Sequence, residues 1–330
     1  MTRLLIYAPS YAAADDEIQR RAPDLDIVVM DEAGAFALNG QPIPPEEARP
    51  DIVWLSEDLY MAPAMLAFAG AVLAAPKLAW AQSASAGFEN PFFGRIVASG
   101  ARLTTSHGQA VGIADFVIWG VLDAFQRGPE RRAAQARSEW LELEVREILA
   151  STWLIIGFGS IGQAVAARAR GFGVRVVGVR RNPAPDPLAD RIASMDDLPT
   201  LLPTADVVVM SAPLNAATLG LADATFFAAM KPGSVLVNVG RGKSLDEAAL
   251  LAALETGAPA HAVLDVFESE PLPSASPLWG HPRVTVTAHC SGVTSGQSLR
   301  NTELFFDNLS RFVAGEPLLN LADPKDVLGG

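Results

Sequence analysis

STWLIIGFGSIGQAVAARARGF, residues 151–172, is the stretch that decides the fold of this chain. Its first part, WLII, has the length and composition of a buried β-strand, and the Ala-rich part at its end is typical of a helix. Gly157, Gly159 and Gly162 lie between the two and form the pattern GxGxxG. A chain rich in Ala and Gly produces this pattern by chance, so its place between a strand and a helix carries the interpretation. That order predicts a turn that binds a dinucleotide.

Each glycine of this turn has its own expected role. In a dinucleotide-binding turn, the first glycine makes the tight bend, the second lets the backbone approach the pyrophosphate, and the third lets the helix pack on the strand. Ser160 and Ile161 complete the turn. The N–H groups at the helix N-terminus then donate to phosphate oxygens. The alternative is that the glycines only cap a strand-to-helix turn; the flanking strand and helix favour cofactor binding.

The next strand, VRVVGV at 174–179, runs into a pair of arginines, Arg180 and Arg181. In folds that prefer NAD, an Asp or Glu at the end of this strand holds the ribose hydroxyls. The first acid here is Asp186. A carboxylate repels a 2′-phosphate, whereas two guanidinium groups bind it through charge-assisted hydrogen bonds. The sequence therefore predicts NADPH as the preferred cofactor over NADH, the alternative being that both arginines are only solvated surface residues.

Outward from this unit, short β-branched runs alternate with Ala-rich amphipathic stretches, which is typical of βαβ units and a mostly parallel sheet. Strands are expected at 4–8, 26–30, 51–55, 77–82 and 95–99, and then at 153–157, 174–179, 207–211, 234–239, 261–266 and 283–288. Helices are expected over 11–22, 61–74, 109–126, 131–144, 161–172, 245–257 and 295–315.

The strands after residue 150 are sufficient for a complete Rossmann domain. The last helix is surplus to that domain and is expected to return to the N-terminal part of the chain. The sequence thus predicts an α/β protein of two doubly wound domains, a Rossmann cofactor domain inserted in a flavodoxin-like substrate domain. The expected bounds are 99–290 for the cofactor domain, and 1–98 with 291–330 for the substrate domain.

The composition is that of an ordinary cytoplasmic enzyme. Half of the 330 residues are hydrophobic, yet the apolar runs are too short for a membrane span. The N-terminus MTRLLIYAPS lacks the long apolar region and cleavage site of a signal peptide. A single cysteine, Cys290, excludes an intrachain disulfide framework. The net charge of −12 disfavours nucleic acid as a partner, because phosphate binding needs a basic surface.

Three chemically active side chains follow apolar strands or turns in the C-terminal half: Arg241 in VNVGRGKSLDE, Glu270 in LDVFESEPLP and His289 in TVTAHCSG. After a dinucleotide turn, this set suits hydride transfer to a carbonyl beside a carboxylate. An imidazolium supplies a proton to the carbonyl oxygen. A carboxylate keeps that ring charged and oriented, and a guanidinium holds the substrate and stabilises developing negative charge. Each residue alone has an ordinary structural explanation, but together they predict a redox enzyme.

The same phrases, together with GFGSIGQAVA, resemble the D-isomer-specific 2-hydroxyacid dehydrogenases over about residues 150–292. Within that family the chain is most similar to the glyoxylate/hydroxypyruvate reductases, chiefly because of the Arg180–Arg181 pair. The resemblance implies that Arg241 binds substrate, that Glu270 partners the histidine and that His289 is the acid/base. Ala288 is a departure, because proline usually precedes this histidine, so the backbone approach to His289 is expected to differ slightly.

Further cofactor and substrate contacts are expected at strand ends. Ser211, Ala212, Pro213, Val239 and Gly240 end strands at the edge where ligands of open α/β sheets bind. The resemblance implies that Asp265 lies near the nicotinamide, with turn capping as the alternative. It also implies that the backbone N–H groups of Ser85-Ala86-Gly87 hold the substrate carboxylate, with a plain tight turn as the alternative. No metal is expected.

Three other side chains draw attention. Trp54 and Trp140 each either wall the substrate pocket or simply pack, and in the first case Trp140 reaches across from a partner subunit. Cys290 is expected to be a small buried hydrophobic residue, since hydride transfer needs no thiol.

The predicted reaction is NADPH-dependent reduction of a small 2-oxo acid, glyoxylate or hydroxypyruvate, to the 2-hydroxy acid, with His289 as proton donor. The alternatives are a dehydrogenase for a bulkier 2-hydroxy acid and a dinucleotide-sensing regulatory protein of the same fold. The expected partner is the small acid, with neither nucleic acid nor membrane. The resemblance also implies a homodimer, with the helical segment 109–144 as its interface.

Overall fold

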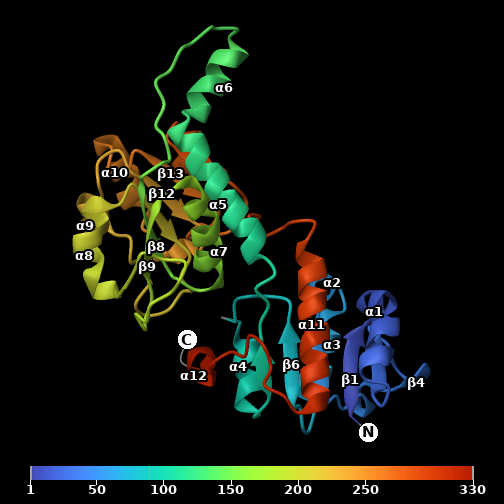
Figure 1. Cartoon of the computed structure of the whole chain (residues 1–330). Coiled ribbons are helices and arrows are strands. Elements are labelled where there is room, and N and C mark those ends of the chain that lie inside the picture. The colour runs from blue at the N-terminus through green and yellow to red at the C-terminus, as the bar shows by residue number, and fades with distance from the viewer. Residues whose placement is uncertain (1, 89, 329–330) are drawn as a thin grey trace. The chain divides into compact units, whose positions relative to one another are not determined.

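The computed structural model describes residues 2–88 and 90–328. It divides into two compact units: unit 1 consists of Met1–Gln109 and Ser295–Gly330, and unit 2 of Ala110–Thr294. The bounds at 109/110 and 294/295 lie C-terminal to the expected ones at 98/99 and 290/291. Each unit contains a seven-stranded sheet, with helices on both of its faces (Figure 1). The predicted α/β fold with two parallel-sheet domains is confirmed.

The sheet of unit 2 is parallel in every described pairing, in the order β10-β9-β8-β11-β12-β13-β14. Its strands are β8 (Thr152–Ile156), β9 (Arg175–Val179), β10 (Arg191–Ala193), β11 (Val207–Met210), β12 (Val235–Asn238), β13 (His261–Leu264) and β14 (Val284–Val286). The chain leaves β8 toward β10 and resumes on the other side at β11, so the strand order reverses between β8 and β11. Open α/β sheets bind ligands at such a reversal.

Helices cover both faces of this sheet, which explains why WLII is apolar at every position. Trp153 and Ile155 pack toward α5 and α7, whereas Leu154 and Ile156 pack toward α8, α9 and α10. A strand buried on both faces reads as a continuous apolar run. The helices of unit 2 are α5 (Ala110–Phe125), α6 (Gly128–Ala136), α7 (Ser160–Ala169), α8 (Leu198–Leu201), α9 (Ala224–Ala229) and α10 (Glu247–Thr256).

The sheet of unit 1 has the order β4-β3-β2-β1-β5-β6-β7. Its strands are β1 (Arg3–Tyr7), β2 (Asp26–Met30), β3 (Phe36–Leu38), β4 (Gln41–Ile43), β5 (Ile52–Leu55), β6 (Trp80–Ser83) and β7 (Arg102–Thr104). The five strands from β2 to β7 in this order are parallel and have the arrangement of flavodoxin. The β3–β4 hairpin adds two antiparallel strands at one edge.

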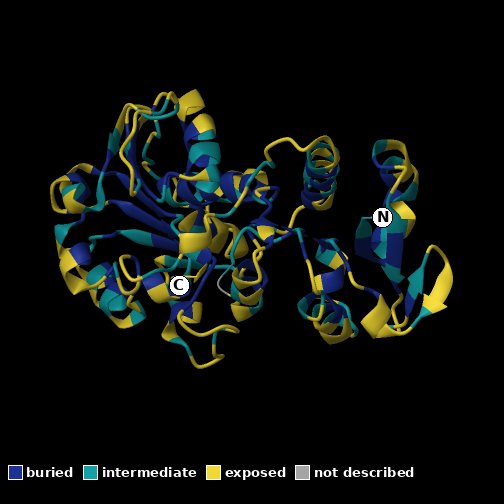
Figure 2. Ribbon diagram, turned by 90° about the horizontal axis from the view of Figure 1, so that it is seen from below, coloured by how far each residue is buried: buried dark blue, intermediate teal, exposed yellow. Residues whose placement is uncertain are grey.

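Two layers of helices complete unit 1 and bury most of its parallel strands, whereas the β3–β4 hairpin at the edge stays largely exposed, as the yellow arrow in Figure 2 shows. On one face Trp54 and Trp80 pack with Phe305 of α11, and on the other Phe68 and Phe93 form the core. The helices are α1 (Ala8–Arg21), α2 (Glu57–Tyr60), α3 (Met65–Leu73), α4 (Pro91–Ala98), α11 (Gln297–Ala314) and α12 (Pro324–Leu328). Helix α11 returns to the N-terminal part of the chain, as expected.

The expected strand at 95–99 is wrong, because these residues belong to helix α4. Asn90 caps this helix by accepting a hydrogen bond from Phe92 N, and Pro91 occupies its first turn. Phe93, Ile96 and Val97 are then buried at helical spacing. The cap and the proline were the signals for a helix in the sequence.

The expected helix at 131–144 is also too long, since α6 ends at Ala136. Ser138 has a φ of 55°, a left-handed backbone that a helix cannot continue through. The chain then runs without regular structure to residue 148, and Figure 1 shows α6 and this segment extending away from the sheet of unit 2. Trp140 lies here with 94% of its surface exposed. The interpretation of Trp140 as simple packing within the chain is therefore wrong.

Among the described residues, the helices are all too short or too polar to cross a membrane. The cytoplasmic location expected from the sequence stays a prediction.

Candidate active site

The glycine turn after β8 has the geometry that its pattern requires. Gly157 has a φ of 96°, and a Cβ on it would lie 2.4 Å from Ala212 N. A Cβ on Gly162 would lie 2.5 Å from Gly157 O and 3.1 Å from a methyl of Ile155, so only glycine lets α7 sit so close to β8. Gly159 differs, because no described atom lies within 4 Å of such a Cβ. Protein packing requires the first and third glycines, and the second leaves open space at the start of α7.

The ends of β11 and β12 meet this turn at the carboxyl edge of the sheet. Ser211 Oγ donates to Gly157 O at 2.9 Å, and Ser211 N donates to Ile156 O. Gly240 lies so close to the Ala212–Pro213 segment that a Cβ on it would be 2.9 Å from Ala212 O. Val239, just before it, is buried. The predicted residues of both strand ends are therefore neighbours of the glycine turn at the point where the strand order reverses.

Arg180 lies at the end of β9, but it already has partners. Its guanidinium donates to Ala184 O and lies 3.5 Å from Asp186 Oδ2. Asp186 also accepts from Gln163 Nε2 at 2.9 Å, which links it to the first turn of α7. Arg181 is exposed. The first acid after β9 is thus folded back onto Arg180, a contact that its sequence distance from β9 did not suggest.

Arg241 follows β12 and begins a short 3-10 turn, Gly242–Ser244. Its Nη1 donates to Gly240 O at 2.8 Å, and its backbone oxygen accepts from the fully buried Asn238. Gly242 makes this possible, since a Cβ on it would lie 1.8 Å from the backbone of Phe267. This close approach brings the Arg241 turn against the segment that carries Glu270. Asn238 was not recognised in the sequence.

Glu270 and His289 form a direct pair. Glu270 Oε2 lies 2.8 Å from His289 Nδ1, and Glu270 Oε1 accepts from Phe267 N at 3.0 Å. His289 keeps 54% of its side chain exposed, against 36% for Glu270. Because Nδ1 faces the carboxylate, Nε2 is the ring nitrogen available to a bound molecule.

A buried carboxylate shapes the turn that carries His289. Asp265 is 1% exposed and accepts from Thr287 Oγ1 at 2.6 Å, Cys290 N at 3.0 Å, and both N and Oγ of Ser291. His289 N donates to Asp265 O at 2.8 Å, and His289 has a φ of 50°. Four donors occupy the lone-pair directions of one carboxylate. Asp265 therefore has the turn-capping role that was the alternative in the sequence, and Thr287 and Ser291 were missed.

Cys290 is exposed, so its interpretation as a buried hydrophobic residue is wrong. Its backbone N–H is drawn to Asp265, which turns the adjacent thiol outward. Strand alternation gives no guide to orientation here, since β14 ends at Val286 and a turn follows.

In unit 1, the loop Ser85-Ala86-Gly87, which was predicted to hold the substrate carboxylate, is only partly as expected. Ser85 N donates to Ser83 Oγ at 3.0 Å, so it is not available to a ligand. Among the described residues, the backbone N–H groups of Ala86 and Gly87 have no acceptor. Successive backbone N–H groups are one of the ways in which proteins bind anions.

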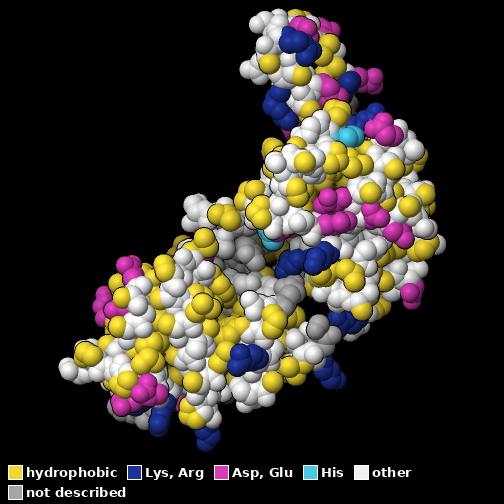
Figure 3. Space-filling view, turned by 180° about the vertical axis from the view of Figure 1, so that it is seen from behind, with side chains coloured by type: hydrophobic (Ala, Val, Ile, Leu, Met, Phe, Trp, Pro, Cys, Tyr) yellow, Lys and Arg dark blue, Asp and Glu magenta, His cyan; other side chains and the backbone are white. Residues whose placement is uncertain are grey.

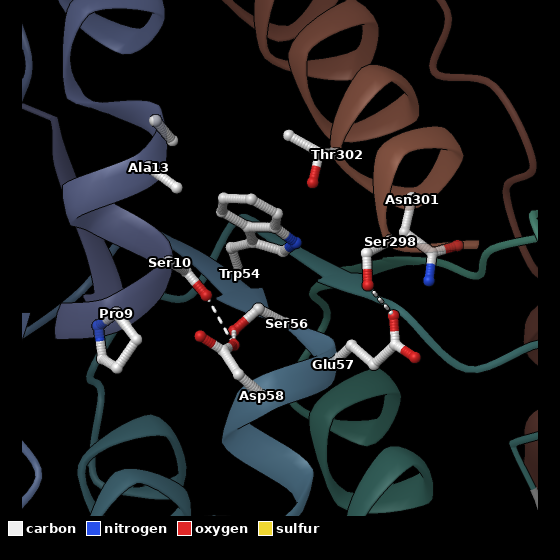
Figure 4. A pocket seen from close by; sticks show the side chains of 11 residues that line it. Pro9, Ser10, Ala13, Trp54, Ser56, Glu57, Asp58, Ser298, Asn301 and Thr302 are labelled. Carbon is white, nitrogen blue, oxygen red and sulfur yellow. Dashed lines mark hydrogen bonds between the residues drawn. The ribbon is translucent and has the colours of Figure 1, made fainter. Parts of the chain in front are cut away.

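Trp54 is packed inside unit 1. Its ring stacks on Phe305 at 4.1 Å between centroids. Its edge lines a cavity of about 200 Å³ between α1 and α11, in which Ser10 donates to Asp58 and Ser298 to Glu57 (Figure 4).

A comparison with models of protein families identifies the family of this chain. Residues 118–291, more than half of the chain, match the model described as D-isomer specific 2-hydroxyacid dehydrogenase, NAD binding domain. The chain belongs to this family.

Similar proteins of this 2-hydroxyacid dehydrogenase family differ in substrate. Glyoxylate/hydroxypyruvate reductase A of Serratia proteamaculans is 35% identical over 58% of this chain and 61% of the reductase. The (S)-sulfolactate dehydrogenase of Chromohalobacter salexigens is also 35% identical, over 63% of this chain and 69% of that enzyme. A D-isomer specific 2-hydroxyacid dehydrogenase from Xanthobacter autotrophicus Py2, solved with NADPH and MES, is 29% identical, covers 99% of both chains and has a TM-score of 0.77.

Within the described part of the chain, no group of three His, Cys, Asp or Glu side chains is arranged to hold a metal. Acidic and basic side chains are interspersed on the face drawn in Figure 3, and the basic ones form no continuous surface there among the described residues.

Proposed function

We propose that this protein reduces a small 2-oxo acid, glyoxylate or hydroxypyruvate, to the 2-hydroxy acid with NADPH. The observation that carries the proposal is the pair of Glu270 Oε2 and His289 Nδ1 at 2.8 Å, in the same unit as the dinucleotide turn. NADPH, when bound, supplies the hydride that reaches the carbonyl carbon. The open space at Gly159 and the N-terminus of α7 fit its pyrophosphate.

The side chains of unit 2 then have separate roles. His289 donates the proton on Nε2 to the carbonyl oxygen, while Glu270 holds the ring by Nδ1. Arg241 binds the substrate carboxylate and carbonyl oxygen, and its positive charge stabilises the negative charge that develops there. Asp265 fixes the turn that presents His289.

In unit 1, the N–H groups of Ala86 and Gly87 are donors that suit a substrate carboxylate. Of the predicted Ser85-Ala86-Gly87 set, Ser85 contributes to the shape of the loop rather than to binding, because its N–H and hydroxyl already have acceptors. Backbone donors suit any 2-oxo acid, since the carboxylate is common to all of them.

Arg180 and Arg181 favour NADPH by binding its 2′-phosphate. The Xanthobacter relative, solved with NADPH, agrees with this choice. Asp186 opposes it, since its carboxylate lies 3.5 Å from Arg180 Nη1 and would repel the phosphate. The proposal is therefore a preference for NADPH, with NADH still accepted.

The identity of the preferred substrate acid has a second candidate. Relatives at the same identity are named for glyoxylate or hydroxypyruvate and for sulfolactate, which carries a second anionic group. A dehydrogenase for such a bulkier 2-hydroxy acid is therefore the second candidate function.

The proposed assembly is a homodimer through segment 109–144. Val111 and Trp119 expose apolar surface on α5, and Trp140 and Leu141 do so on the segment beyond α6. Exposed apolar side chains gathered on adjoining elements are typical of interfaces. In that dimer Trp140 contacts the partner subunit.

The test is the loss of nicotinamide absorbance with glyoxylate, hydroxypyruvate and sulfopyruvate, each with NADPH and with NADH. We expect the two smaller acids to be reduced fastest, with NADPH. His289→Ala should lower kcat by at least about 10²-fold, the usual contribution of a general acid. Arg283→Ala, a change elsewhere in unit 2, is the control. Fastest turnover of sulfopyruvate would favour the second candidate, and no turnover of any acid would contradict both.

A further inference from the structure

The loops after β5 and β6 lie together at one edge of the unit 1 sheet. The two strands are parallel, and Leu55 pairs with Ser83 at their carboxyl ends. Helix α2 (Glu57–Tyr60) follows β5 almost at once, and residues 84–88 follow β6. Parallel strands in register deliver both following segments to the same edge, so α2 is placed to influence the 84–88 loop.

The 84–88 loop is held by four hydrogen bonds. Ala84 N donates to Leu55 O and Ser106 N to Ser85 O, both at 2.9 Å. Ser85 Oγ donates to Gly87 O at 2.8 Å, and Ser85 N donates to Ser83 Oγ at 3.0 Å. All the polar groups of Ser85 are therefore used within the protein, whereas the N–H groups of Ala86 and Gly87 have no acceptor among the described residues.

The hydroxyl of Ser83 connects Tyr60 of α2 to the 84–88 loop. Ser83 is fully buried, and its Oγ lies 2.8 Å from Tyr60 Oη as well as 3.0 Å from Ser85 N. A serine hydroxyl rotates freely unless its partners fix it. Contacts on two sides hold Ser83 Oγ where it can accept from Ser85 N.

Tyr60 is an unusual residue for this place if packing were its only purpose. Its ring keeps 37% of its surface exposed, while its hydroxyl turns inward to Ser83. Desolvation raises the pKa of Tyr60 to about 12, against the opposite effect of the Ser83 bond, so the hydroxyl is neutral at any working pH. A neutral hydrogen-bonding group braces the loop without repelling an anion bound beside it, as a carboxylate would.

We propose that Tyr60 is a positioning residue for substrate binding: through Ser83 it holds the 84–88 loop in the conformation that presents the N–H groups of Ala86 and Gly87 to the substrate carboxylate. The bracing of the loop is independent of the reaction, whereas its consequence for substrate rests on the proposed function.

The first measurement is hydrogen–deuterium exchange of the free full-length protein, followed at the Ser85 amide. Tyr60→Phe should speed this exchange by about threefold to tenfold, which is what the loss of one hydrogen bond allows. Tyr11→Phe is the matched control, because Tyr11 is also in unit 1 and has its own partners on α1. Exchange at Ser85 that is equal in Tyr60→Phe and wild type would overturn the proposal, whatever the enzyme does.

The second measurement is steady-state reduction of glyoxylate. In Tyr60→Phe we expect KM to rise about threefold to tenfold, with kcat within about twofold and NADPH affinity unchanged. Ser83→Ala should have at least the same effect, and the double variant should add nothing, because both changes remove one path. A changed kcat at constant KM, or full additivity, would contradict a positioning role. Altered exchange in a protein that reduces no 2-oxo acid would instead leave the bracing intact and remove the proposed function.

Discussion

At the residue scale, the buried carboxylate of Asp265 organises more of the site than any other single group. It accepts from four donors in the stretch from Thr287 to Ser291, and its backbone oxygen accepts from His289 N. Without these bonds the left-handed backbone at His289, with a φ of 50°, has little to hold it. The imidazole would then lose the alignment that proton transfer needs.

Asp265→Asn should therefore lower kcat by about 10–100-fold, since small displacements of a reacting group are costly. An amide nitrogen would face N–H donors, so stability should also fall by about 1–3 kcal/mol. The matched control is Asp190→Asn, which removes a carboxylate that accepts from Val176 N in the same unit. Kinetics and urea unfolding of both variants provide the check. If Asp190→Asn lowers kcat as much as Asp265→Asn, the effect on turnover is general destabilisation.

Residues that end apolar strands were the ones that sequence reasoning could identify. Arg241, Glu270 and His289 occupy recognisable phrases, and the structure brings Glu270 and His289 into contact. Cys290 was misjudged because its exposure depends on the turn that Asp265 shapes, and no periodicity extends into a turn. The contact of Asp186 with Arg180 was not predicted, because an irregular loop makes it.

At the element scale, the segment beyond α6 is anchored by a buried ion cluster around Asp206. Asp206 is 6% exposed and accepts from Lys231 Nζ at 2.6 Å, Thr152 N at 2.8 Å and Arg146. Arg146 also donates to Gly233 O and lies 4.3 Å above the Phe125 ring. This cluster ties the end of an otherwise irregular segment to β8 and α5.

The cluster predicts a pH dependence of stability. Burial raises the pKa of Asp206, but the bonds from Lys231, Thr152 and Arg146 outweigh burial and the net pKa is lowered from 3.8. A pKa that is lower in the folded protein contributes stability above the ordinary value, and that contribution is lost as pH falls through the folded value. Asp206→Asn should cost about 1–3 kcal/mol at pH 7.

Urea unfolding of wild type and Asp206→Asn between pH 7 and pH 3 checks this. The difference between them should shrink below about pH 4, as the wild-type carboxyl takes up its proton. Asp24→Asn, an exposed acid without a described partner, should match wild type at every pH. A gap between wild type and Asp206→Asn that is constant with pH would contradict the ionic origin.

Helices and strands could be predicted where burial produces a clear hydrophobic period in the sequence. They could not be predicted where turn residues determine the course of the backbone. The β8 strand and α7 helix follow from a continuous apolar run and the glycines after it. The β3–β4 hairpin was missed although Asn39-Gly40, with φ of 48° and 81°, is a strong hairpin signal. Its strands have three residues each, too few for alternation to show.

At the scale of the whole molecule, the glycine turn after β8 belongs to unit 2, and so do Arg180 and Arg181, which are predicted to bind the 2′-phosphate. A ligand that binds the folded state alone stabilises it by RT ln(1 + [L]/Kd), about 2.7 kcal/mol at 100 times Kd. At equal concentration NADPH should therefore raise the melting temperature more than NADH, in proportion to the extra affinity that Arg180 and Arg181 give.

Thermal unfolding of wild type and of Arg180→Gln/Arg181→Gln with each dinucleotide tests this. Losing two charge-assisted bonds should weaken NADPH binding by about 10–100-fold and leave NADH nearly unaffected. Arg191→Gln, whose exposed guanidinium pairs with Asp197, is the matched control. Equal shifts from NADPH and NADH in wild type would mean that Asp186 neutralises the arginine pair. Because the shift reports binding and not turnover, the cofactor preference is tested independently of any substrate.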